Sequence, residues 1–159
     1  MIITSNQPGK NGKYHSKSGY YFVQHPEKYL SKTKPIFKSN LERLMMKYLD
    51  NNPNVINWIY EPRPIYYRDY SQIDHSTGRP GKQRKYFIDF VATVKTPDNH
   101  LKTIWIEVKS EKETHPPKNK NNKLEVETWI RNQSKWDAAK KLCESKGIEF
   151  VIITDEQLK

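Results

Sequence analysis

Residues 85–95 read KYFIDFVATVK, and residues 101–109 read LKTIWIEVK. In both stretches apolar side chains alternate with others, which is the pattern of a β-strand that buries one face. Residues 96–99, Thr-Pro-Asp-Asn, are typical of a turn. The sequence therefore predicts two antiparallel strands joined by a tight turn.

The predicted strand pair carries two carboxylates and a lysine. Asp89 lies on the first strand, and Glu107 and Lys109 share one face of the second, because side chains alternate with a period of two. Neighbouring carboxylates repel each other unless a cation lies between them, and oxygen ligands suit Mg²⁺ or Mn²⁺. Such a metal can activate a water and stabilise a phosphate under attack, and Lys109 can orient that water or offset phosphoryl charge. A solvated face with a cross-strand salt bridge would contain the same residue types.

The distance between the two carboxylates depends on the register of the strands. If Lys95 pairs with Leu101, Asp89 lies directly opposite the glutamate. If Lys95 pairs with His100, Asp89 lies opposite Ile106, and only a bulge restores the match. Both registers are compatible with the sequence.

The residues before the strand pair predict a helix and further strands. Apolar residues at helical spacing follow Ser39, Glu42 completes a capping box with it, and residues 51–53, Asn-Asn-Pro, end the helix. Next comes a β-rich run at residues 55–60, followed by a second short strand at residues 65–68. Residues 69–83 form a long loop or a hairpin tip.

The residues after the strand pair predict a second helix and a last strand. Residues 110–123 are polar, and we expect them not to pack. A helix covers at least residues 134–146, with Trp136 and Cys143 on its packed face and Gly147 as its stop. Residues 148–154 form an apolar strand. This order predicts an α/β or α+β domain on a mixed sheet.

The chain is strongly basic, and its charge is clustered. Its 159 residues include 28 Lys and Arg against 18 Asp and Glu. Residues 1–40 carry seven lysines and one glutamate, and residues 81–120 carry nine basic and five acidic residues. Lysines alternate with aromatic residues in the first block, so we interpret residues 1–34 as a basic arm for an anionic partner, with a solvated flexible arm as the alternative.

Several classes of protein do not fit this composition. The longest apolar run, residues 150–153, is too short for a membrane span, and residues 1–3 do not begin a signal peptide. One cysteine allows neither an internal disulfide framework nor a cysteine-based zinc site. We therefore expect a soluble intracellular protein.

The acidic pair with its lysine resembles the active site of the PD-(D/E)XK nuclease superfamily. That resemblance implies a restriction-endonuclease-like αβββαβ core with a mixed central sheet. It also implies an auxiliary role for Glu42 on the first helix, although capping already explains that residue. Ile88 stands where the superfamily has proline, which is a mild departure because the proline supplies no catalytic atom.

A second resemblance is closer and covers most of residues 13–158. Six stretches are similar to the head completion nucleases of T4-like tailed phages: residues 60–62, 86–90, 106–109, 115–118, 132–139 and 149–154. The resemblance implies a Mg²⁺- or Mn²⁺-dependent DNA endo- or exonuclease that acts in head completion and head–tail joining. Its setting would be the host bacterial cytoplasm, with association with the virion as a further option.

This resemblance assigns roles to individual residues. Asp89, Glu107 and the Val108 carbonyl would bind the metal, Lys109 would act on the water or the phosphate, and Glu42 would assist. Residues 1–34 would be the arm, and residues 35–159 the nuclease domain. Lysines would hold the DNA backbone without reading its sequence, namely Lys13, Lys17, Lys112, Lys118, Lys120 and Lys135. Phage portal or neck proteins are further expected partners.

Two other functions remain open at this point. One is a non-catalytic neck or DNA-packaging protein that binds DNA or a portal. The other is a transposon-end or repair nuclease built on the same core.

Overall fold

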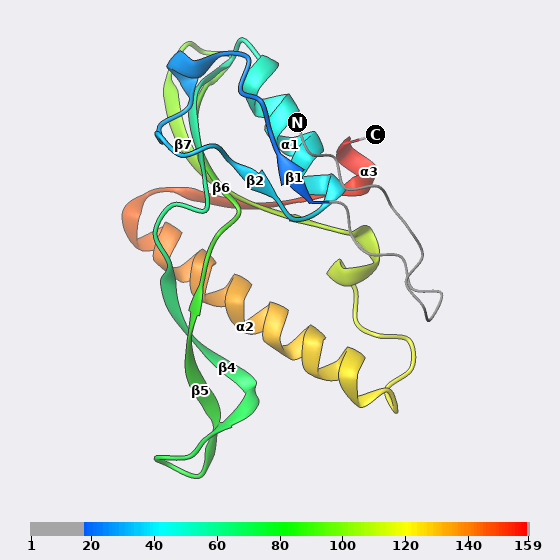
Figure 1. Ribbon diagram of the computed structural model, residues 1–159. Helices are drawn as coiled ribbons and strands as arrows, with labels where there is room; N and C mark the ends of the chain where they lie inside the picture. Colours follow the sequence, from blue (N-terminus) through cyan, green and yellow to red (C-terminus); the bar gives the residue numbers. More distant parts are fainter. Residues whose placement is uncertain (1–17, 159) are drawn as a thin grey trace, which may run out of the picture.

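The computed structural model describes residues 18–158. Its centre is a four-stranded sheet in the order β3-β6-β7-β8, in which β7 and β8 are parallel and the other pairs antiparallel. The strands are Val55–Tyr60 (β3), Phe90–Lys95 (β6), Leu101–Lys109 (β7) and Glu149–Thr154 (β8). A parallel neighbour needs a crossover, which helix α2, Lys123–Lys146, supplies. The predicted α/β class and restriction-endonuclease-like fold are thus confirmed (Figure 1).

Helix α1, Asn40–Asn51, begins and ends where the sequence predicts. The Oγ of its N-cap, Ser39, accepts a hydrogen bond from the Glu42 N–H at 3.1 Å. At the other end, Asn52 is the C-cap, and its N–H reaches the Tyr48 carbonyl. The local sequence signals were sufficient here because both caps lie within a few residues of the helix.

The two long helices pack on opposite faces of the sheet. The larger apolar cluster joins α1 to β3, β6 and β7, and its buried members include Met46, Leu49, Trp58, Phe90, Ile106 and Val108. The smaller cluster lies on the α2 side and includes Tyr67, Tyr86, Ile88 and Ala139, with Trp105 and Phe150 packed against it. Residues of β7 therefore alternate between the two clusters, and Glu107 and Lys109 share the parity of Trp105.

Helix α2 is longer than the apolar pattern predicts. It begins at Lys123, where the Asn122 side chain caps the Glu125 N–H, and it ends at Gly147 with φ of 65°. Its first turns carry little apolar burial, and Leu124 is largely exposed, so that half has no periodic signal. Trp136 and Cys143 are buried as predicted. The polar residues before the helix are mostly exposed and contain a short 3-10 helix, η2, Glu111–Thr114.

For residues 69–83 the sequence left a long loop or a hairpin tip open, and the structure has a hairpin whose strands extend through most of this range. Residues 65–86 form a hairpin of two antiparallel strands, β4 (Ile65–Asp74) and β5 (Arg79–Tyr86), which forms its own sheet. In Figure 1 it extends away from the central sheet alongside α2. Alternation does occur in β4, but Asp69 takes an inward position, so a search for alternating apolar residues does not find the strand.

The predicted continuous strand at residues 85–95 is wrong. β5 ends at Tyr86 and β6 begins at Phe90. Tyr86 and Ile88 pack in the α2-side cluster, whereas Phe90 and Ala92 pack in the α1-side cluster. The apolar alternation is unbroken in sequence, but the chain changes faces between Ile88 and Phe90.

The described part of the predicted arm packs on the fold, unlike a free arm. Strands β1 (Gly19–Tyr20) and β2 (Ile36–Phe37) pair with each other, and a 3-10 helix, η1 (Pro26–Lys28), lies between them. The Tyr21 hydroxyl donates to buried Asp50 at 2.8 Å, and the Tyr29 ring lies 4.5 Å from that of Trp58. These contacts have no sequence period, so patterning does not predict them. The domain boundary at residues 34–35 stays a prediction.

A short helix, α3 (Asp155–Leu158), follows β8 directly. Among the described residues, no helix is both long enough and apolar enough to cross a membrane.

Candidate active site

The register of β6 and β7 brings the predicted carboxylates together. Lys95 pairs with Leu101, and the ladder runs to Phe90 opposite Ile106, so Asp89 comes next, opposite Glu107. This is the first of the two registers that the sequence allowed, and no bulge is needed.

Asp89 is held by main-chain groups on both sides. Its Oδ2 accepts a hydrogen bond from the Val108 N–H at 2.8 Å, and its carbonyl accepts one from the Glu61 N–H at 2.8 Å. The first contact fixes the carboxylate against β7, and the second ties its backbone to the end of β3. Asp89 is thereby held at the junction of three strands.

Glu107 is buried on β7, and only 6% of it is exposed. Its Oε2 accepts a hydrogen bond from the Tyr86 hydroxyl at 2.6 Å. Tyr86 ends β5, so this bond also links the hairpin to the central sheet. Sequence analysis assigned no role to Tyr86, although it lies within a stretch that resembles the phage nucleases.

The electrostatics of this carboxyl pair are unfavourable without a cation. Burial and the nearby charge of Glu107 raise the pKa of Asp89 well above its usual range, and burial also raises the pKa of Glu107. The hydrogen bond from Tyr86 and the neighbouring Asp89 side chain both lower the pKa of Glu107 against the effect of burial. Lys109 opposes both increases, since its charge lowers the pKa of each carboxyl.

This donor set suits a hard divalent cation. Two carboxylates whose pKa values are raised by burial would be stabilised in their ionised forms by positive charge between them. Within residues 18–158, no third acidic, histidine or cysteine side chain joins them in a metal-binding group. Backbone oxygen, water and substrate phosphate would have to complete the shell of such an ion. The Val108 carbonyl stays a predicted ligand.

Comparison with known proteins assigns the family. Residues 52–155, from the C-cap of α1 to the first residue of α3, match the TnsA-like endonuclease N-terminal family. This chain belongs to that family. It is also 33% identical over 152 residues to the head completion nuclease of Enterobacteria phage T4. The aligned region covers 89% of this chain and 93% of the phage T4 protein. The predicted membership among PD-(D/E)XK nucleases of the phage head completion type is therefore confirmed.

In this TnsA-like chain, Glu42 lies beside the carboxyl pair without joining it. Its Oε2 accepts hydrogen bonds from the Lys38 N–H at 2.6 Å and from the Tyr60 hydroxyl at 3.0 Å. Its charge is also one of the causes that raise the pKa of Asp89. Glu42 thus has a structural role at the start of α1 and an electrostatic effect on the site.

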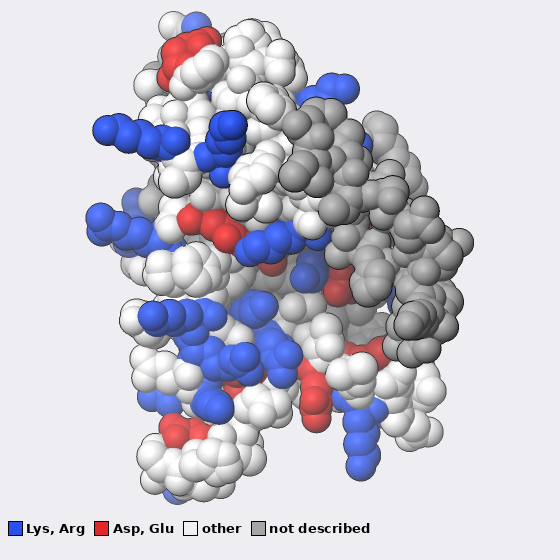
Figure 2. Space-filling model, in the orientation of Figure 1, with Lys and Arg blue, Asp and Glu red and all other residues white. Residues whose placement is uncertain are grey.

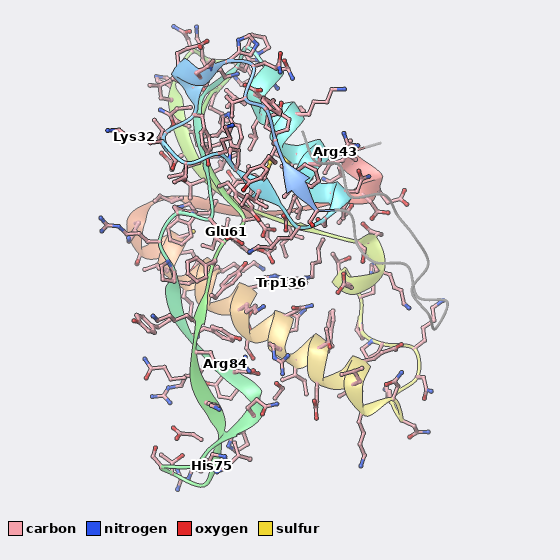
Figure 3. All side chains as sticks on the ribbon, viewed as in Figure 1. Lys32, Arg43, Glu61, His75, Arg84 and Trp136 are labelled. Carbon is pink, nitrogen blue, oxygen red and sulfur yellow. The ribbon has the colours of Figure 1, made fainter. Side chains whose placement is uncertain are left out.

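Glu61 is a residue near the site that sequence analysis left without a role. It lies at the end of β3, where the hairpin leaves the sheet (Figure 3). Its φ of 41° is unusual for a residue with a side chain, and its carboxylate pairs with Lys38. The strained turn directs the Glu61 N–H to the Asp89 carbonyl. The local signals of this turn are the prolines at positions 62 and 64.

Lys135 reaches the site from α2. Its Nζ lies 5.4 Å from the centre of the Tyr86 ring. Burial and the nearby charge of Lys109 lower the pKa of Lys135, while the charge of Glu107 raises it. The structure therefore places Lys135 among the site residues and assigns Trp136, its buried neighbour, to packing.

Three of the other predicted DNA-binding lysines lie within the described residues. Lys112, Lys118 and Lys120 are exposed on the segment between β7 and α2. Lys13 and Lys17 lie outside the described residues. The lysines whose charges act on the pKa of Glu107 are Lys109 and Lys135.

Proposed function

We propose that this chain is a metal-dependent deoxyribonuclease that hydrolyses phosphodiester bonds at Asp89 and Glu107. The observation that carries the proposal is a pair of adjacent carboxyls with raised pKa values, half-buried Asp89 and buried Glu107, next to a lysine in a chain of a nuclease family. Asp89, Glu107 and the Val108 carbonyl would hold Mg²⁺ or Mn²⁺. When bound, that ion would supply an activated water and charge stabilisation for the phosphate.

The residues of the chain would position the reactants. The Val108 N–H and the Tyr86 hydroxyl each hold one carboxylate oxygen, which limits rotation of both side chains. Lys109 would orient the attacking water or offset charge on the phosphoryl oxygens, and Glu42 would assist through its charge. In the reaction, the water oxygen bonds to phosphorus, one ester bond breaks, and a water proton is transferred so that the leaving oxygen becomes a hydroxyl.

The proposed biological setting is the completion of a phage head and its joining to a tail. The similarity to the T4 head completion nuclease runs over nearly the whole of both chains, which supports a common role rather than a shared core alone. The chain would act in the host bacterial cytoplasm or on the virion. Its partners would be DNA, held without sequence specificity by residues such as Lys112, Lys118 and Lys120, and portal or neck proteins.

A transposon-end or repair nuclease is the second candidate. The match of residues 52–155 to the TnsA-like family favours it. That match includes the catalytic core but leaves out α1 and the residues before it, whereas the similarity to the phage protein covers 89% of the chain. Neighbouring genes distinguish the two candidates, since portal and capsid genes indicate the first and transposase genes the second.

The test is a cleavage assay with Mg²⁺ on linear duplex, circular duplex and single-stranded DNA. We expect cleavage by the wild type, loss of cleavage in chelator, and loss in Asp89→Asn. Asp98→Asn is the matched control, because Asp98 is an exposed aspartate in the turn between β6 and β7. Cleavage of circular DNA would indicate endonuclease activity, and cleavage restricted to linear DNA would indicate exonuclease activity.

A folded Asp89→Asn variant that cleaves like the wild type would exclude the proposed site. A wild type that binds DNA but does not cleave any of the three substrates would instead favour the structural neck protein.

A further inference from the structure

The β4–β5 hairpin presents a row of basic residues on the strand face that leads to the carboxyl pair. Lys82, Arg84 and Tyr86 occupy alternate positions of β5 and so share one face. The hydroxyl of Tyr86 contacts Glu107, which identifies the face. The pairing register adds Asp69 opposite Lys82.

Asp69 holds two arginines in place across the gap between the hairpin and α2. It is fully buried, and its Oδ2 accepts from the Arg131 Nε at 3.0 Å and lies 3.4 Å from a terminal nitrogen of Arg84. Burial would raise the pKa of Asp69, but hydrogen bonds from Ser71 and Arg131 lower it. The carboxylate is therefore ionised, and two guanidinium groups converge on a single negative charge.

Both arginines keep donors available to solvent. The side chains of Arg84 and Arg131 are 43% and 32% exposed, respectively. A guanidinium group has five N–H donors, and the contacts with Asp69 use few of them. Asp69 fixes the orientation of both guanidinium groups. The protein therefore loses less side-chain entropy when an anion binds to them than when an anion binds to free lysines.

Helix α2 continues this row of cations to the carboxyl pair. Arg131 and Lys135 lie one turn apart on the same side of the helix, about 6 Å along its axis. The charge of Arg131 affects the pKa of Lys135, as do those of Glu107 and Asp89. Figure 2 shows Lys and Arg side chains gathered over this part of the molecule, and Figure 3 places Arg84 on the hairpin.

We propose that these cations form a binding surface for the phosphate backbone of duplex DNA next to the cleavage site. We call it the hairpin–α2 track, and it consists of Lys82, Arg84, Arg131 and Lys135. The proposal rests on the nuclease function and names the residues that hold its substrate. Three of the four, all except Lys135, were not among the residues that the sequence predicted to bind DNA.

The chemistry of the track favours phosphates over bases. Stacking on bases needs exposed aromatic rings, but the rings on this face of the hairpin, Tyr67 and Tyr86, are buried. The exposed rings Tyr66 and Tyr70 alternate with them and lie on the opposite strand face. Arginine forks that are held in place suit phosphate oxygens, so the track should bind DNA without reading its sequence.

The test compares DNA affinity in a double variant, Lys82→Gln/Arg84→Gln, with the wild type. Asp69 keeps its contacts with Arg131 and Ser71 in this variant, so no buried carboxylate is left unpaired. The probe is a short fluorescein-labelled duplex of arbitrary sequence, followed by anisotropy over a series of salt concentrations in chelator. The control is Lys47→Gln/Lys95→Gln, which removes two exposed charges, one on α1 and one at the far end of β6.

We expect the track variant to bind more weakly than the control, with a salt dependence reduced by about one unit of log–log slope for each phosphate that is no longer neutralised. Equal effects in both double variants would mean that only net charge matters and would overturn the proposal. One labelled strand of the same duplex is measured alongside it, and a loss of affinity confined to that single strand would also overturn the proposal. Cleavage by the wild type, together with unchanged affinity in the track variant, would reject the track and leave the nuclease function standing. Weaker binding by the track variant, with no cleavage by the wild type, would support the track as a DNA-binding surface and reject the nuclease function.

Discussion

Replacement of Asp89 by asparagine should abolish cleavage and yet stabilise the metal-free protein. The asparagine side chain can accept from the Val108 N–H, as Asp89 does at 2.8 Å, and its amide can donate to the neighbouring Glu107 carboxylate. The change therefore keeps the hydrogen bond from Val108 and removes a carboxyl whose ionised form is disfavoured by burial and by Glu107.

The magnitude follows from the linkage between protonation and folding. Because the pKa of Asp89 is raised in the folded protein, wild-type stability is complete below the unfolded value near pH ~4 and declines as the pH rises toward the folded value. Each unit of increase costs about 1.4 kcal/mol once the pH exceeds both values. For a chain of this length, one such unit is about 3–6 °C in Tm. The advantage of Asp89→Asn should accordingly vanish below about pH 4.

Thermal melts in chelator from pH 4 to 8 measure this effect, and a second series with Mg²⁺ tests the site. Metal that binds only the folded wild type should raise its Tm, and the variant should lose that response. Asp98→Asn is the control, because hydrogen bonds from Thr96 and His100 lower the pKa of Asp98, so its substitution should not stabilise. A variant Tm at or below that of the wild type at pH 8 in chelator would refute the argument, as would an Mg²⁺ response that survives the substitution.

Three further substitutions test individual contacts. Tyr86→Phe removes the hydrogen bond that lowers the pKa of Glu107 against the effect of burial, so the pKa of Glu107 should rise. The acidic limb of the pH–rate profile should therefore move to higher pH, and an unchanged limb would contradict this. Lys109→Ala should reduce the cleavage rate by roughly 10²–10³-fold with circular dichroism unchanged, and wild-type rates would exclude its role. Gly147→Ala should cost about 1–2 kcal/mol in urea unfolding, because Gly147 has the left-handed φ of +65°. An added Cβ would meet no atom within 4 Å, so the cost is from the backbone alone, and no loss would mean that the helix end relaxes.

The parts of the fold that sequence predicted are those set by short-range rules. Ser39 and the residues at 51–53 bracket α1 because helix caps act within one turn. The turn at 96–99 limited the register of β6 and β7 to two choices, and the sequence could not select between them. The choice depends on how Thr96 and His100 close the turn, where the Thr96 N–H donates to the His100 carbonyl at 2.8 Å.

The parts that sequence did not predict depend on polar contacts between distant segments. A search for alternating apolar residues does not find the hairpin, because its inward residue Asp69 is charged. Arg131, the partner that allows Asp69 to be buried, lies 62 residues later in the chain. Asp50 likewise accepts from the Gln24 and His25 N–H groups of the predicted arm. No local signal identifies such partners, because each of these charged or polar residues, taken alone, is of a type that is usually exposed to solvent.

The misjudged strand at 85–95 also explains how the site is assembled. In an unbroken strand, Tyr86 would share a face with Phe90 and would lie on the α1 side of the sheet, opposite to Glu107. The break after Tyr86 moves this ring to the α2 side, where its hydroxyl reaches Glu107 at 2.6 Å. Asp89 keeps the parity of β6 and so faces Glu107 as well. The break in the strand thus brings the hairpin and the central sheet to the same glutamate, and the basic face of the hairpin follows from that placement.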